Sequence, residues 1–204
     1  MTRIKLCGLF RPCDVDYVNE AKPDYCGFIV NFPKSHRNVT PEQVRILRAK
    51  LLPSITPVGV FVDQPAETVA ALLKDGTLSV AQLHGHEDER YIAALRALVP
   101  GREIWKAFQV RSRKDLDAAK ASTADLVLLD NGYGTGQTFD WSLIREIGRP
   151  FFLAGGLNPD NLSQAIRQVR PYGVDLSSGV ETDRQKDPAK IRAVVAAVRT
   201  TATQ

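Results

Sequence analysis

The sequence predicts an α/β fold, a single-domain (β/α)8 (TIM) barrel, from three observations. Short apolar runs alternate with amphipathic stretches along the whole chain, a pattern typical of parallel strands joined by helices. The 204 residues hold eight such units, whereas a doubly wound open sheet, the rival architecture, usually has about five or six strands. No linker or low-complexity segment divides residues 1–204, so we expect one domain.

The expected strands are short apolar runs bounded by glycine, proline or polar residues. They are predicted at Ile4–Cys7, Tyr25–Val30, Thr56–Val62, Ser79–Leu83, Glu103–Phe108, Leu126–Asp130, Phe151–Ala154 and Gly173–Leu176.

Capping signals mark several of the expected helices. Thr40 and Pro41 combine an N-cap residue with proline at the first helical position. Asp75-Gly76 is a typical helix stop. Helices are predicted at Pro12–Glu20, Glu42–Leu51, Ala66–Leu73, Asp88–Leu98, Lys114–Ala121, Trp141–Ile147, Asn161–Val169 and from Pro188 to about Arg199.

The composition is that of an ordinary globular protein, with 44% hydrophobic and 25% charged residues. This excludes disordered, collagen-like and coiled-coil chains, and no apolar run approaches the roughly 18 residues of a membrane helix. The N-terminus resembles neither a signal peptide nor a transit peptide. All three cysteines lie at or before Cys26, a number and placement that favour free thiols and a cytoplasmic location. The sequence leaves the oligomeric state open.

The net charge of +4 suits a small anionic substrate better than a nucleic acid. The tightest basic cluster, Arg111–Lys114, contains no aromatic residue and is followed at once by acidic residues. We therefore expect no nucleic-acid partner and no membrane partner.

Two glycine-containing loops predict a phosphate site. In (β/α)8 barrels phosphate usually binds to the loops after the seventh and eighth strands, near a short extra helix. Gly155 and Gly156 follow the seventh expected strand, and Ser178 and Gly179 follow the eighth. Glycine lets backbone N–H groups approach a phosphate closely, so we expect phosphate to bind here.

A third glycine run, Gly132–Gly136, lacks the glycine spacing and the following helix of a dinucleotide-binding fingerprint. We expect it to be a mobile loop over the active site.

His84 and His86 are two residues apart at a strand end and could face one metal ion. Only His36 remains as a further histidine, and no third ligand is evident, so we expect no metal. His84 is a candidate substrate contact, although a polar residue satisfied at a strand end is an equal alternative.

Two reactive side chains end strands on different sides of the expected barrel. Cys7 closes the first strand and Asp130 the sixth, both at the carboxyl end, where active sites of such barrels lie. Taken alone, Cys7 could be a buried, unreactive thiol, and Asp130 could simply cap a loop. Together above a phosphate site they suit a base and an acid acting on two atoms of one sugar phosphate.

The chain resembles the phosphoribosylanthranilate isomerase family of tryptophan biosynthesis. The resemblance extends from about residue 3 to 195. The matching segments are Lys5–Leu9, Gly27-Phe28, Ser35–Arg37, Val58–Phe61, Gln82–Gly85, Leu129-Asp130, Gly134–Gly136, Phe139–Trp141, Ala154–Leu157, Val174–Glu181 and Lys186-Asp187.

This resemblance implies an Amadori rearrangement of N-(5′-phosphoribosyl)anthranilate without cofactor or metal. It implies that Asp130 protonates the furanose ring oxygen and that Cys7 removes the C2′ proton. Arg37 corresponds to the family's arginine that faces the anthranilate. The sequence departs from the family pattern at Phe10, His36 and Tyr133, and the segment after Asp130 is shorter than usual.

Two other functions are compatible with such a barrel. The related isomerase of the histidine pathway uses a carboxylate where this chain has Cys7, and a non-catalytic phosphate-binding barrel needs no acid–base pair.

Strand alternation places Lys5 below Cys7, facing inward. A buried ammonium needs a partner, and Asp175 on the neighbouring eighth strand is predicted to supply it as a second-shell ion pair. Because proton abstraction requires a thiolate, we expect the pKa of Cys7 to lie below its ordinary value.

Overall fold

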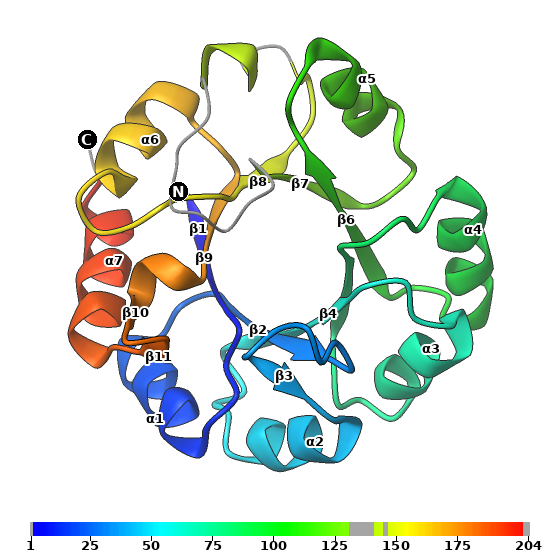
Figure 1. Ribbon diagram of the computed structural model, residues 1–204, viewed down its shortest axis with the longest axis horizontal. Coiled ribbons are helices and arrows are strands. Elements are labelled where there is room, and N and C mark those ends of the chain that lie inside the picture. Colours follow the sequence, from blue (N-terminus) through cyan, green and yellow to red (C-terminus); the bar gives the residue numbers. More distant parts are fainter. Residues whose placement is uncertain (1, 131–140, 145–146, 202–204) are drawn as a thin grey trace.

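The computed structural model describes residues 2–130, 141–144 and 147–201. Their parallel strands form a closed barrel surrounded by helices (Figure 1). The barrel strands are β1 (Arg3–Cys7), β2 (Tyr25–Val30), β4 (Thr56–Phe61), β5 (Val80–Leu83), β6 (Glu103–Gln109), β7 (Leu126–Asp130), β8 (Phe151–Leu153) and β9 (Gly173–Leu176).

The strand order is β1-β9-β8-β7-β6-β5-β4-β2, and pairing of β1 with β2 closes the barrel. Every neighbouring pair is parallel. The outer helices are α1 (Pro12–Ala21), α2 (Pro41–Ala49), α3 (Ala66–Lys74), α4 (Glu89–Leu98), α5 (Arg113–Ala121), α6 (Leu162–Val169) and α7 (Pro188–Thr201).

The fold confirms the predicted architecture, and most boundaries agree with the expected ones within about two residues. Local signals explain several of them. The Thr40 hydroxyl accepts a hydrogen bond from the Gln43 backbone N–H at 3.2 Å, and the Gln43 side chain accepts one from the Thr40 N–H at 2.8 Å. This capping box, with Pro41 in the first turn, fixes the start of α2.

Three features differ from the expected pattern. The segment expected as a helix at Trp141–Ile147 is a 3₁₀ helix, η1, over Trp141–Ile144 in its described part. A two-residue strand, β3 (Asn38–Val39), extends the sheet beside β2. After β9, the 3₁₀ helix η2 (Ser178–Val180) leads into a short hairpin of β10 (Glu181–Thr182) and β11 (Gln185–Lys186). Runs this short contain too few residues to show a periodicity.

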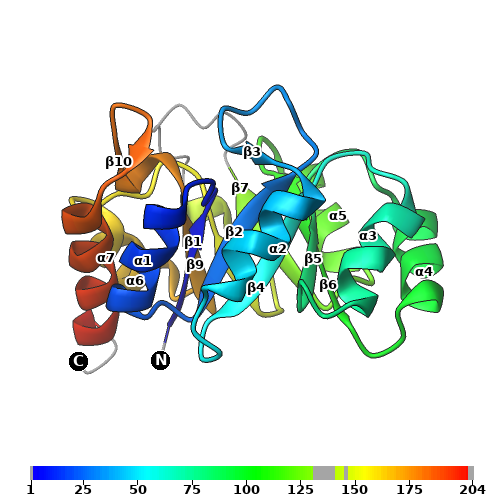
Figure 2. The same ribbon diagram turned by 90° about the horizontal axis from the view of Figure 1, so that it is seen from below.

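The hairpin and β3 lie at the same end of the barrel, opposite the start of β1 and the end of α7 (Figure 2). No helix in the described ranges is long and apolar enough to cross a membrane.

Large side chains fill the barrel below the site. The rings of Trp105 on β6 and Phe152 on β8 are buried and stack with centroids 4.9 Å apart. Residues two positions later on a strand face the same way, and there the small side chains of Ala107 and Ala154 line an open pocket. The large rings of Trp105 and Phe152 thus form the floor of the pocket, and the small side chains above them leave it open at the carboxyl ends of the strands.

Candidate active site

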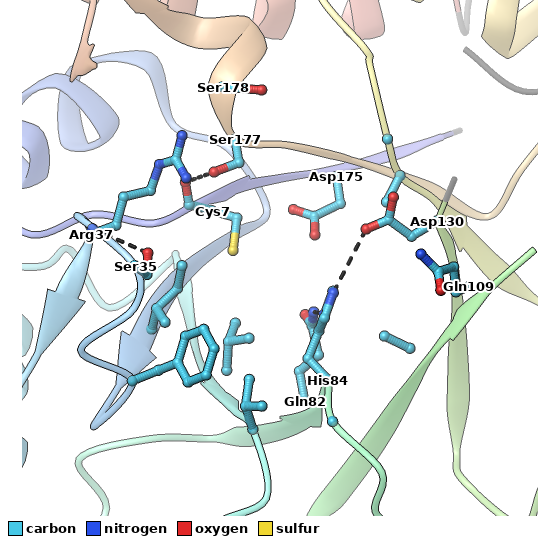
Figure 3. A pocket seen from close by; sticks show the side chains of 18 of the residues that line it. Cys7, Ser35, Arg37, Gln82, His84, Gln109, Asp130, Asp175, Ser177 and Ser178 are labelled. Carbon is cyan, nitrogen blue, oxygen red and sulfur yellow. Dashed lines mark hydrogen bonds and ion pairs between the residues drawn. The ribbon is translucent and has the colours of Figure 1, made fainter. Parts of the chain in front are cut away.

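A pocket of about 700 Å³ opens at the carboxyl ends of the barrel strands. Its polar lining comes from β1, β5, β6, β7 and β9 and from the loops that follow strands (Figure 3). It contains eight of the predicted site residues, namely Cys7, Arg37, His84, Asp130, Gly155, Gly156, Ser178 and Gly179, and also Asp175.

Cys7 ends β1 with only 7% of its surface exposed. Its register partner on β2 is Gly27, and a Cβ there would lie 2.8 Å from the Cys7 sulfur and 3.1 Å from the Lys5 ammonium nitrogen. The absence of a side chain at this position therefore makes room for the thiol and the ammonium next to each other.

Lys5 and Asp175 form the buried ion pair that strand alternation predicts. They are register partners on β1 and β9, and Lys5 Nζ lies 2.9 Å from Asp175 Oδ2. Lys5 is fully buried and Asp175 is 8% exposed. The attraction of Asp175 and an interaction with Cys7 outweigh the effect of burial and raise the pKa of Lys5. The ammonium therefore stays charged beneath the thiol.

We expect Lys5→Met and Asp175→Leu each to lower the free energy of unfolding by about 3–5 kcal/mol, because each leaves one buried charge unpaired. The double variant should lose less than the sum of the two. Urea denaturation of the four proteins measures this coupling. The exposed pair Arg45–Asp75, which is 2.8 Å apart, is the matched control, with a coupling of about 0–1 kcal/mol. Additive losses at Lys5 and Asp175 would contradict the pairing.

The expectation that the pKa of Cys7 lies below its ordinary value is wrong. Burial raises the pKa of the thiol, and the nearby Asp175 carboxylate raises it further. Lys5, and more weakly Lys186, act in the opposite direction without reversing the shift. The protonated thiol is therefore the favoured form of Cys7 at neutral pH.

This shift predicts slow alkylation of Cys7 by iodoacetamide at neutral pH. Only the thiolate reacts, so the inactivation rate should still be rising with pH above about 8.5, the ordinary thiol value. A bound product analogue should protect the enzyme. Mass spectrometry of a Cys13→Ser background, which lacks the partly exposed thiol, assigns the modified site. A rate that levels off below the ordinary thiol range would contradict the raised pKa.

Asp130 ends β7 with its side chain 19% exposed, and its Oδ2 lies 3.7 Å from Nε2 of His84. The other ring nitrogen of His84 is 3.0 Å from the amide nitrogen of Gln82. Because that amide donates, Nδ1 accepts, and the neutral ring carries its hydrogen on Nε2, facing Asp130. Burial of the ring in the pocket lowers the pKa of His84 and favours this neutral form.

Figure 3 shows Cys7 and Arg37 on one side of the pocket and Asp130 with Gln109 on the other. The side chains of Asp175 and His84 lie between the two sides in this view. The arrangement can offer a base and an acid to different atoms of one bound molecule.

The loops predicted to bind phosphate lie together at the pocket rim. Gly155 and Gly156 both have positive φ, 86° and 68°, a backbone conformation that glycine adopts without strain. A Cβ on Gly179 would overlap the Leu157 carbonyl oxygen, so the loop after β9 packs directly on the loop after β8. Ser178 begins η2 beside them.

Arg37 lies at the rim and forms two hydrogen bonds with Glu181, each 2.6 Å. Lys186 Nζ contacts the same carboxylate at 2.7 Å. Sequence reasoning assigned no role to Glu181, Lys186 or Gln82. All three lie in segments on which the family resemblance rests. A polar or charged side chain close to the end of a strand was the signal that could have marked them as site residues.

His86 does not join His84 at a metal site. Its side chain is 95% exposed and pairs with Asp63 at 2.9 Å. Within the described ranges, no group of three potential ligand side chains could hold a metal ion. The glycine run 132–136, with Tyr133, lies outside the described residues.

The closed barrel and the polar pocket at its strand ends define a (β/α)8-barrel enzyme with a facing acid and thiol. Residues 4–197 match a family described as N-(5′-phosphoribosyl)anthranilate (PRA) isomerase. The chain belongs to this family.

Relatives match it over almost their whole length. N-(5′-phosphoribosyl)anthranilate isomerase of Acetivibrio thermocellus is 44% identical over 98% of this chain and 96% of its own. The enzyme of that name from Thermoanaerobacter sp. strain X514 is 40% identical, with 98% of each chain covered.

Solved structures agree. Phosphoribosyl anthranilate isomerase from Thermotoga maritima is similar with a TM-score of 0.88 and 35% identity over 98% of this chain and 100% of its own. A phosphoribosyl anthranilate isomerase crystallised with reduced 1-(o-carboxyphenylamino)-1-deoxyribulose 5-phosphate has a TM-score of 0.86 and 34% identity, at the same coverage of both chains.

Proposed function

We propose that this chain isomerises N-(5′-phosphoribosyl)anthranilate to 1-(2-carboxyphenylamino)-1-deoxyribulose 5-phosphate, a step of tryptophan biosynthesis, with Asp130 as acid and Cys7 as base. The observation that carries the proposal is the presence of both side chains in the pocket of a full-length member of this isomerase family. As the family resemblance implies, we propose no cofactor or metal.

Substrate binding begins with the phosphate. The backbone of Gly155, Gly156 and Gly179 and the Ser178 hydroxyl line one side of the pocket and offer hydrogen-bond donors to phosphate oxygens. Arg37, at the rim beside Glu181, is placed for the anthranilate, whose carboxylate and ring a guanidinium can both bind.

Asp130 performs the first step. It gives its proton to the furanose ring oxygen as the C1′–O bond breaks, and the nitrogen lone pair forms the C1′=N bond of an open-chain iminium. The N–H of His84 facing Asp130 then stabilises the carboxylate that remains.

Cys7 performs the second step. Its thiolate removes the C2′ proton, the electron pair of the C–H bond forms the C1′=C2′ bond, and the π pair of the C1′=N bond returns to nitrogen. The resulting enolamine takes up a proton at C1′ and loses one from the C2′ hydroxyl, which gives the ketone. Because the iminium accepts the electrons, a base of moderate strength suffices.

Complementation tests the function directly. The chain should restore growth without tryptophan in a strain that lacks this isomerase, and the purified protein should convert the substrate, followed by anthranilate fluorescence. Failure of the folded protein in both assays would contradict the proposal. Rescue of a histidine auxotroph instead would favour the related isomerase of that pathway. A cytoplasmic location and the absence of a nucleic-acid partner remain predictions.

A further inference from the structure

The guanidinium of Arg37 is held along one edge by a carboxylate from a distant part of the chain. Arg37 Nε lies 2.6 Å from Glu181 Oε1, and Nη2 lies 2.6 Å from Oε2. The Glu181 side chain is only 5% exposed, and that of Arg37 is 17% exposed. Such a bidentate pair fixes the plane and the direction of the guanidinium.

A second buried cation balances the same carboxylate. Lys186 is almost fully buried, and its Nζ lies 2.7 Å from Glu181 Oε1 and 3.0 Å from the Ser177 carbonyl oxygen. Ser177 donates its hydroxyl hydrogen to the Cys7 carbonyl oxygen. Arg37 and Lys186 together carry two positive charges against one negative charge, so the cluster retains one positive charge for an incoming anion.

The stem of Arg37 is fixed as well. Gly8 has φ +79°, and a Cβ there would overlap Cδ of Arg37, so the arginine lies directly over the residue that follows Cys7. The Arg37 backbone N–H also donates to the Ser35 hydroxyl oxygen at 3.2 Å. The Glu181 carboxylate, Gly8 and Ser35 thus fix the position of the arginine at the rim of the pocket, where Figure 3 shows it beside Ser35.

Arg37 bonds Glu181 through Nε and Nη2, and among the described residues its Nη1 has no hydrogen-bond acceptor. We infer that Glu181 is a positioning residue that makes the enzyme selective for a carboxylate on the aromatic ring of its substrate. It holds the nitrogens Nε and Nη2 of Arg37 and leaves Nη1 to the pocket, while Lys186 keeps the cluster positive. This inference rests on the proposed function.

The experiment compares two substrates that differ only in that carboxylate, N-(5′-phosphoribosyl)anthranilate and N-(5′-phosphoribosyl)aniline. The wild-type enzyme should have a higher kcat/KM for the first. In Glu181→Gln this ratio should fall by about 10- to 100-fold. The variant should have a higher KM for N-(5′-phosphoribosyl)anthranilate, whereas kcat/KM for N-(5′-phosphoribosyl)aniline should be nearly unchanged. Gln cannot accept both guanidinium donors.

Three control variants separate positioning from a general effect on folding. Glu181→Gln/Lys186→Met removes both buried charges of this pair, so no ammonium is left unpaired, and it should lose the selectivity as the single variant does. Lys186→Met alone leaves the arginine–glutamate pair intact but removes the net positive charge of the cluster, so it should lose part of the selectivity, and less than the double variant loses. Glu42→Gln, an exposed glutamate on α2, should match the wild type.

Equal losses for both substrates in Glu181→Gln and the double variant would overturn the inference and assign Glu181 a purely structural role. An unchanged ratio, or a wild-type enzyme indifferent to the carboxylate, would also overturn it. A wild-type enzyme that turns over neither substrate would instead refute the proposed function.

Discussion

Cys7→Ala is expected to lower kcat by at least about 10²-fold, the typical contribution of a positioned base. The methyl group cannot accept the C2′ proton. Lys5, which lies below the Cys7 sulfur, cannot replace the base because it is a cation paired with Asp175. KM should change little because the phosphate and anthranilate contacts remain. Steady-state kinetics with the fluorescent substrate measure both constants.

The matched control for this variant is Cys13→Ala on α1, outside the pocket, which should keep wild-type kinetics. Thermal unfolding of both variants verifies that the fold persists. A Cys7→Ala enzyme within about threefold of wild-type kcat would contradict the assignment of the base.

Asp130→Asn is expected to lower kcat by a similar factor of at least about 10². Asparagine has the same shape and keeps an oxygen near Nε2 of His84, which lies 3.7 Å from Asp130 Oδ2, so the geometry should persist. The amide has no proton to give to the ring oxygen, so ring opening should become the slow step. Comparison of kcat with that of Asp117→Asn, an exposed aspartate on α5, isolates the effect of the acid.

Near-normal kcat in Asp130→Asn would show that ring opening needs no acid at this position. A loss of the same size in Asp117→Asn would point to a general effect of amide substitution on the protein.

The barrel could be predicted from sequence because each strand and each helix carries its own local signal. The expected bounds of Tyr25–Val30, Leu126–Asp130 and Gly173–Leu176 match β2, β7 and β9 residue for residue. Apolar runs between turn residues define such strands without knowledge of their partners. The same locality placed Cys7 and Asp130 at strand ends, and the strand order of the barrel then brought them into one pocket.

What could not be predicted depends on contacts between distant residues. Arg37 and Glu181 are 144 positions apart, and no local pattern couples them. The pKa of Cys7 was expected to fall because a thiolate was needed, but burial, which sequence does not quantify, raises it. The hairpin that carries Glu181 and Lys186 is too short to have a periodic signature.

The central claim is that Asp130 opens the ring and Cys7 then removes the C2′ proton. Trapping with cyanoborohydride tests it most directly, because this reagent reduces the open-chain iminium but not the closed ring. With substrate bound, Cys7→Ala should accumulate the iminium and yield the reduced 5-phosphoribityl anthranilate well above the enzyme-free background. Asp130→Asn should stay at that background. Equal trapping in both variants, or trapping only in Asp130→Asn, would contradict the account.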